Sequence, residues 1–437
     1  MKVPLRLLLT GAACLLAAVS LSASSPSGSD ARSRAESLAF QKKAIEAYRS
    51  RDWAGFLENA RRAQALDPDN PRILYTLACA QARSGHAAEA AKLLETLLDR
   101  RLDFGSETDE DFAAVRGAKE LAGVRTRLER LRRPAGGSRV AFVLPEKDLL
   151  TEGVAYDPAS RAFFVSSVHR RKILRRAAGG AVSDFVREGQ DGIESVLAIA
   201  VDPARGRLYA CSAALPQMSG YEKSREGSSA LFAFELATGK LAGRWPLPAD
   251  GKPHAANDLS VGSDGEVYVT DSLGSGIYRL RPGASALDVV AAPGVFRSPQ
   301  GIGFGPNGRL YVADWGYGLF WLDNEGKRHE VEAPPDLPLL GIDGLVLQGR
   351  RVFVVQNGIA PHRVAALELD AAGDRIVRGE LLDMNDPEFD EPTLAVLVDG
   401  ALYVNGRSQW GKFDEKTGAF DPGKLREPAI LKIDLPR

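Results

Sequence analysis

The chain has 437 residues, of which 44% are hydrophobic and 26% charged, as in an ordinary globular protein with a substantial buried core. With 56 basic and 57 acidic residues its net charge is −1, so no overall field favours binding to nucleic acid or to an anionic membrane. A chain of this length is expected to form two or more domains.

The N-terminus has the pattern of a secretory signal peptide. Lys2 and Arg6 precede an apolar run from residue 7 to residue 21, and mostly small residues follow. We expect residues 1–25 to be removed on export, which predicts a periplasmic or secreted protein with no membrane span in the mature chain. Cys79 and Cys211 then remain, in different predicted domains, which favours two buried free thiols over a disulfide.

Residues 31–133 are predicted to form a helical domain, because apolar residues recur there with helical spacing among Ala, Leu, Glu and Arg. Within 71–98 the small and apolar positions are Leu74, Leu77, Ala78, Gly85, Ala90, Leu94 and Leu97. This pattern resembles a tetratricopeptide repeat, in which paired helices approach closely at small residues. The resemblance implies either a groove for a protein partner or a structural spacer.

Residues 134–138, "PAGGS", are predicted to be a linker, after which the pattern changes from helical to strand-like. The same hairpin pattern occurs twice, 43 residues apart: in "NDLSVGSDGEVYVTD" from Asn257 and in "QGIGFGPNGRLYVAD" from Gln300. A repeat of this length with several strands indicates a β-propeller blade. We therefore predict an α plus all-β protein with two domains.

Four further copies of the hairpin make six blades in residues 139–437. The first residues of the copies are Glu152, Leu197, Asn257, Gln300, Asp343 and Thr393. The segment "RVAFVLP" after the linker is predicted to complete the last blade, because propellers commonly close with a strand from each end of the domain. The polar stretch "PQMSGYEKSREGSS" is predicted to be an extended loop of the second blade.

The first residue of each copy is expected to face the central channel, and five of these six residues carry polar oxygens. Two carboxylates and two amides form a hard-oxygen site of charge −2, which suits Ca²⁺ or another divalent cation better than zinc or copper. The alternative is that these side chains only bind water or satisfy strand ends in a solvated channel.

Residues 139–437 also resemble the gluconolactonase and senescence-marker-protein family of six-bladed propellers. The resemblance rests on "TEGVAYDP", "HAANDL", "SPQGIGFGPNGRLYVAD" and "GIDGL". It implies that Glu152, Asn257, Gln300 and Asp343 bind a divalent ion and that a small lactone or ester is hydrolysed, with Asp343 as the base. The sequence departs from the family pattern at Gln300, where many members have asparagine.

Another departure is the pair Ala255 and Ala256, which replaces a basic residue before the "ND" pair. The alternative function is therefore a non-catalytic propeller that binds a ligand or a protein, with the helical repeats as a docking surface. His254 is predicted to act as a proton shuttle or a substrate contact, or else to be a loop histidine. Residues at the ends of second strands are expected to contact a ligand or to cap turns: Asp271, Asp314, Gln356 and Asn405.

Overall fold

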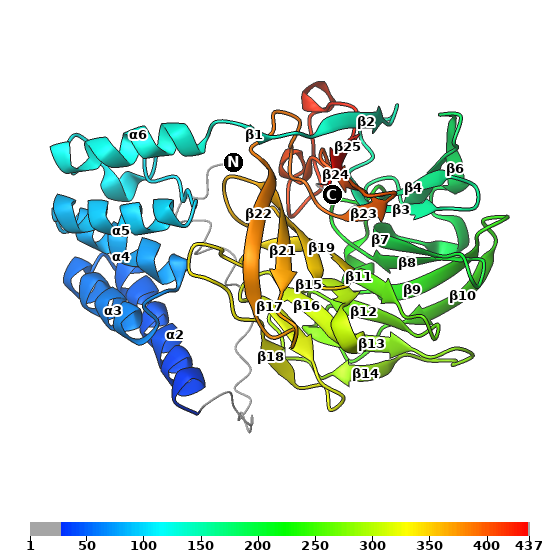
Figure 1. Cartoon of the computed structure of the whole chain (residues 1–437), viewed down its shortest axis with the longest axis horizontal. Coiled ribbons are helices and arrows are strands. Elements are labelled where there is room, and N and C mark those ends of the chain that lie inside the picture. Colours follow the sequence, from blue (N-terminus) through cyan, green and yellow to red (C-terminus); the bar gives the residue numbers. More distant parts are fainter. Residues whose placement is uncertain (1–27, 436–437) are drawn as a thin grey trace. The chain divides into compact units, whose positions relative to one another are not determined.

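The computed structural model describes residues 28–435, which form two compact units (Figure 1). The first unit ends at Arg133 and also includes Pro335–Leu337 and Ile359–Pro361, and the second contains the rest of the described chain. The predicted signal peptide, residues 1–25, lies outside the described residues. In the part that is described, no helix is both long and apolar enough to cross a membrane.

The first unit is helical, as predicted, and its successive helices pack against each other. Its helices are α2 (Gly28–Arg49), α3 (Trp53–Leu66), α4 (Pro71–Arg83), α5 (Ala87–Asp99) and α6 (Ala122–Leu131), with short 3₁₀ turns η1 (Glu110–Phe112) and η2 (Lys119–Leu121). Helix α4 begins where Asn70 accepts hydrogen bonds from the backbone N–H groups of Arg72 and Ile73. Gly85, with φ of +78°, forms the turn from α4 to α5. The tetratricopeptide type of these helices stays a prediction.

The second unit is a six-bladed β-propeller, as predicted (Figure 1). The first three blades are β3 (Thr151–Asp157), β4 (Ala162–Ser167), β5 (Lys172–Arg176) and β6 (Val182–Val186); β7 (Ser195–Asp202), β8 (Arg207–Ala213), β9 (Ser229–Glu235) and β10 (Leu241–Pro246); and β11 (Ala256–Val261), β12 (Val267–Asp271), β13 (Gly276–Leu280) and β14 (Asp288–Ala291). The fourth and fifth are β15 (Pro299–Phe304), β16 (Leu310–Asp314), β17 (Gly318–Leu322) and β18 (Arg328–Glu330); and β19 (Ile342–Gln348), β20 (Arg351–Gln356), β21 (Arg363–Leu369) and β22 (Ile376–Met384).

The sixth blade combines both ends of the propeller. Its strands are β23 (Ala395–Val398), β24 (Ala401–Asn405), β25 (Ala429–Asp434) and β2 (Arg139–Val143), and β2 pairs antiparallel with β25. The predicted closure by the segment after the linker is therefore confirmed. The first strands of neighbouring blades contact each other around the whole ring, from β3 through β7, β11, β15, β19 and β23 back to β3, which makes them the innermost strands.

Other sequence predictions also correspond to observed features. Part of the predicted linker forms β1 (Ala135–Gly136), which pairs with β22 at the edge of the fifth blade. The polar stretch of the second blade connects β8 to β9, and it includes a 3₁₀ turn, η4 (Lys223–Arg225). Cys79 and Cys211 are both free and buried, as expected.

Three glycines let neighbouring inner strands approach closely. A Cβ on Gly153 would lie 2.7 Å from the Leu197 carbonyl oxygen, one on Gly301 would lie 2.7 Å from the Asp343 carbonyl oxygen, and one on Gly344 would lie 2.5 Å from the Thr393 carbonyl oxygen. In each case the obstacle is the backbone of the next blade, which cannot move without opening the ring. The glycine after a channel residue is therefore required by packing between blades.

We expect Gly344→Ala to destabilise the propeller by about 1–3 kcal/mol, as overpacking does elsewhere. Gly179→Ala is the control, because a Cβ there would meet no heavy atom within 4 Å, and its effect should stay within about 0.5 kcal/mol. Denaturant unfolding of both variants measures the difference. Equal stabilities would show that the inner strands are not closely constrained.

Candidate functional site

The channel residues share one local backbone feature. In five blades the pairing between the first and second strands shifts register at the channel residue, as between Thr151 and Val154 around Glu152, or between Ile342 and Gly344 around Asp343. A β-bulge leaves its extra residue unpaired and re-aims the side chain. The bulges therefore release these side chains from the regular alternation of the strand. In the sixth blade Thr393 lies just before β23.

Each of the four predicted ligands has a hydrogen-bond partner that fixes its side chain. Glu152 Oε2 accepts from Trp410 Nε1 at 2.6 Å, and Asp343 Oδ2 accepts from Asn357 Nδ2 at 2.5 Å. Asn257 Nδ2 donates to Gln300 Oε1 at 2.5 Å, so these two amides are linked directly. The other two ring residues offer no free ligand oxygen, since Leu197 is apolar and the Thr393 hydroxyl donates to the Glu152 carbonyl oxygen at 2.8 Å.

Three buried side chains keep an oxygen without a hydrogen bond from the described residues: Glu152 through Oε1, Asn257 through Oδ1 and Asp343 through Oδ1. Their residues are only 4%, 7% and 7% exposed. Gln300 Oε1 already accepts from Asn257, but a carbonyl oxygen has a second lone pair. Such oxygens are the kind of donor that Ca²⁺ prefers, but among the described residues no three carboxylates of the channel bring oxygens within 4.8 Å of one another.

Four carboxyl groups lie close enough to influence one another. Burial and the nearby Asp343 raise the pKa of Glu152 well above its usual range. Burial alone raises the pKa of Asp343 to about 6, although the bond from Asn357 opposes the rise. Burial raises the pKa of Asp258 and of Glu391 to about 7, and Asp343 adds to both effects.

No Lys, Arg or His among the described residues forms an ion pair with any of these four carboxyl groups. Buried like charges without a counter-charge must take up protons or a cation. Asp258 has another task, because its two oxygens accept the backbone N–H groups of Leu259 at 2.8 Å and of Ile302 at 3.1 Å. Since Ile302 belongs to the next blade, Asp258 ties the third blade to the fourth.

His254 is held between two carboxylates. Its Nδ1 lies 2.5 Å from Asp271 Oδ2 and its Nε2 lies 3.0 Å from Asp250 Oδ1. Burial opposes charging, but these hydrogen bonds raise the pKa of His254 above its usual value. Both ring nitrogens are therefore engaged at a site that is 2% exposed. The predicted role in proton transfer stays a prediction.

The residues at the ends of second strands make turn and strand contacts in the structure. Asp271 accepts from the backbone N–H groups of Ala255 and Gly274, and Asp314 accepts from those of Arg297 and Gly316. The remaining two are Gln356, which donates to the carbonyl oxygens of Pro338 and Leu340, and Asn405, which bonds Thr151 and Thr393. These contacts agree with the turn-capping alternative.

The sequence interpretation missed Glu391 and Asn357. Glu391 stands two positions before Thr393, where the other blades have Leu150, Ser195, Ala255, Ser298 and Gly341. Strand alternation could not have found it, because Glu391 precedes β23 and has a left-handed φ of 64°. Asn357 follows the end of a second strand, next to the predicted Gln356, and it fixes Asp343 instead.

A hollow opens on the same face as the channel residues. It is lined by His169, Pro216, Met218, Tyr221 and Phe420, among others, and has a volume of about 480 Å³. Its loops connect the second and third strands of blades one, two and six. Such loops lie at the end of the blade where the first strand begins, and this is where the channel residues are.

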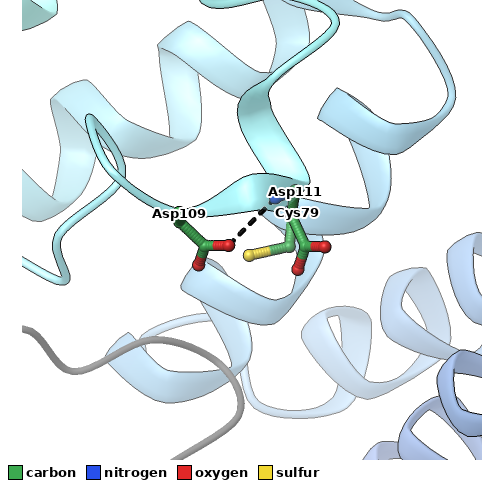
Figure 2. Close-up of side chains that lie close together, drawn as sticks. All are labelled: Cys79, Asp109 and Asp111. Carbon is green, nitrogen blue, oxygen red and sulfur yellow. Dashed lines mark hydrogen bonds between the residues drawn. The ribbon is translucent and has the colours of Figure 1, made fainter.

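Among the described residues, one group of three potential ligands from His, Cys, Asp and Glu has its atoms within 4.8 Å: Cys79, Asp109 and Asp111 of the helical unit (Figure 2). Asp109 accepts from Tyr75 Oη at 2.7 Å and from the Asp111 backbone N–H at 3.0 Å. Asp111 Oδ1 accepts from Arg83 Nε at 2.6 Å. Arg83 already supplies positive charge here, and burial raises the pKa of the Cys79 thiol well above its usual range. This cluster is best explained as a structural network.

No family model and no curated protein matches the sequence. Solved structures similar to the propeller include a gluconolactonase from Xanthomonas campestris, at 19% identity over 70% of this chain and 99% of that one, with a TM-score of 0.44. Virginiamycin B lyase from Staphylococcus aureus is 12% identical over 69% and 100%, with a TM-score of 0.46. An aldose sugar dehydrogenase from Streptomyces coelicolor is 14% identical over 69% and 99%, with a TM-score of 0.47. These three names describe different activities, and a likeness of this degree says nothing about the chemistry of this chain.

The raised pKa values predict how stability depends on pH without a cation. The pKa of Asp343 is raised from 3.8 to about 6 and that of Glu391 from 4.5 to about 7. At a pH between the ordinary and the raised pKa of each group, the folded state therefore holds more protons than the unfolded state. The free energy of unfolding should therefore fall as pH rises from about 4 to about 7.

Thermal melts in chelator across this pH range measure the effect, with an expected fall of a few degrees in melting temperature. Asp343→Asn should flatten the dependence, whereas Glu325→Gln, a change at an exposed turn, should not. Identical pH profiles for all three proteins would contradict the assignment of buried, mutually repelling carboxyl groups.

Proposed function

We propose that the channel binds a divalent cation of the Ca²⁺ type and that the propeller hydrolyses a small lactone or ester. The observation that carries this proposal is a group of three buried carboxyls, Glu152, Asp258 and Asp343, with the partly buried Glu391 nearby and no ion pair to a cationic side chain of the described residues. The ligands would be Glu152, Asn257, Gln300 and Asp343. A bound divalent ion would polarise the substrate carbonyl and stabilise the negative charge that develops on its oxygen.

Asp343 is the best candidate for the base. A bound cation would keep this buried carboxyl ionised, so that it could accept a proton from a water molecule. Its Oδ2 is held by Asn357, whose Oδ1 lies 3.4 Å from Trp315 Nε1, so Asp343 would meet the ion and a water molecule bound to that ion through Oδ1. As water oxygen bonds to the carbonyl carbon, Asp343 takes the proton and passes it to the alkoxide oxygen when the ester C–O bond breaks.

The hollow among the loops of blades one, two and six, on the face where the channel residues lie, is a candidate place for the remainder of the substrate. Met218, Tyr221 and Phe420 offer apolar contacts there, and pockets of this size bind small molecules.

We also propose that the protein is exported, on the strength of the N-terminal pattern in residues 1–25. The affinity for Ca²⁺ should then be in the range of extracellular modules, about 0.1–1 mM. A protein partner for the helical unit is likewise a proposal.

The cation site is tested with the chain that begins after residue 25. Calorimetric titration with CaCl₂ should show binding, and a chelator should lower the melting temperature by a few degrees because the ion stabilises only the folded state. Glu325→Gln should behave like the wild type. An absence of both heat and chelator effect would contradict the site.

Catalysis is tested with a panel of lactones and aryl esters. Asp343→Asn should lower kcat by about 100-fold or more, as loss of a general base does, while Glu325→Gln should leave it unchanged. Hydrolysis that survives the Asp343 change would remove Asp343 as the base. Cation binding without hydrolysis of any substrate would favour the alternative, a non-catalytic ligand-binding propeller.

A further inference from the structure

The hollow that His169 lines is formed by three connections of the propeller that are hydrogen-bonded to one another. His169 lies between β4 and β5, and its carbonyl oxygen accepts the backbone N–H of Ser219, in the β8–β9 connection, at 2.8 Å. Gln217 of that connection donates through Nε2 to the Glu415 carbonyl oxygen of the β24–β25 connection at 3.4 Å. The hollow, of about 480 Å³, therefore has walls that hold each other in place.

One wall of the hollow is aromatic. The Phe420 ring centroid lies 5.0 Å from that of His169, edge to face, and 4.6 Å from that of Phe413. Phe413 belongs to a buried apolar cluster against which both Phe420 and Trp410 pack. Trp410 Nε1 in turn donates to Glu152 Oε2. The wall of the hollow and a channel carboxylate are therefore joined through one apolar cluster.

His169 presents one open hydrogen-bond acceptor at the hollow. Its Nδ1 lies 2.6 Å from the Gln217 carbonyl oxygen, which can only accept, so Nδ1 must carry a proton. The second nitrogen of a neutral imidazole is then an acceptor. Nε2 has no hydrogen-bond partner among the described residues, and it is not one of their buried polar atoms that lack a partner, so it is accessible. The fold thus fixes the tautomer and leaves Nε2 for a donor from outside the chain.

The rest of the lining limits what the hollow can bind. None of the described residues that line it is Asp, Glu, Lys or Arg, and Met218, Tyr221 and Phe420 are among its larger side chains. A charged group would lose solvation there without gaining an opposite charge. An aromatic ring would instead gain edge-to-face or offset contacts with the aromatic side chains. The lining therefore favours a neutral ring over an acid or an amine.

We propose that the hollow binds a neutral aromatic ring that carries a hydroxyl group, and that His169 Nε2 accepts the hydrogen of that hydroxyl. This inference rests on the proposed function and deepens it, because the part of the substrate remote from the reacting carbonyl becomes a hydroxyaryl group. His169 then determines specificity, and the Gln217 carbonyl oxygen keeps its ring in the orientation that offers Nε2. Phe420 and Tyr221 supply the contacts to the ring of the ligand.

The test compares 2-naphthol with its methyl ether, which has the same rings but no donor. Both are titrated by fluorescence into the chain that begins after residue 25, in chelator, so that no cation takes part. We expect the wild type to bind 2-naphthol about fivefold more tightly than the ether, as one additional hydrogen bond implies. His169→Asn can still donate to the Gln217 carbonyl oxygen but has no Nε2, so it should lose the preference, while Glu325→Gln should keep it.

A second variant tests the location without changing the histidine. Ala419 is exposed and lines the hollow, so Ala419→Trp should fill the hollow and abolish the binding of both probes. Thermal melts show that each variant is folded. If His169→Asn does not fold, Ala419→Trp and the preference of the wild type between the two probes still decide the question.

Equal affinity of the wild type for the two probes, or a preference that survives in folded His169→Asn, would overturn the proposal. Binding of 2-naphthol that Ala419→Trp leaves unchanged would also overturn it, since the probe then lies elsewhere. The titrations need neither a cation nor hydrolysis. Ester hydrolysis without binding of 2-naphthol would therefore overturn only this inference, whereas the expected binding without hydrolysis of any ester would support the site and contradict the hydrolase.

Discussion

Closure of the ring by the pairing of β2 with β25 is the constraint on which the rest of the structure depends. Residues 139–143 and 429–434 are the two ends of the propeller, and only their pairing completes the sixth blade. An open sheet would present its inner strand ends to water, where carboxylates are well solvated. Closure instead brings Glu152 and Asp343 from different blades into one channel, and burial then raises the pKa of both.

The repeat made most of the fold predictable. Hairpin turns and the alternation of apolar and polar residues are local signals in the sequence, and the hairpin pattern recurs at intervals of about the length of one blade. The same frame located the channel residues, since equivalent positions of a closed ring face each other. It did not identify Glu391, because the equivalent position of the other blades carries no carboxylate. Nor did it show that Asn257 and Gln300 bond each other, since a contact between blades depends on their packing.

The residue that follows each channel residue shows how packing and chemistry are combined in one motif. After Glu152, Gln300 and Asp343 stands a glycine, because the next inner strand passes too close for a side chain. After Asn257 stands Asp258, which reaches the backbone N–H of Ile302 in the fourth blade. The "ND" pair therefore joins a channel amide to a carboxylate that links blades, and its acidic member belongs to the architecture rather than to the ligand set.

The channel carboxylates are each held by one hydrogen bond to one oxygen. In a solvated channel each carboxylate could turn freely and bind water through both oxygens. Here Trp410, Asn357 and Gly411 each hold one oxygen of Glu152, Asp343 and Glu391, and the other oxygen of each accepts no hydrogen bond from the described part of the chain. Fixing three repelling groups in this way opposes folding unless something positive meets the free oxygens. This conflict between stability and charge is characteristic of functional sites, and it is the physical reason to look for a cation in this channel.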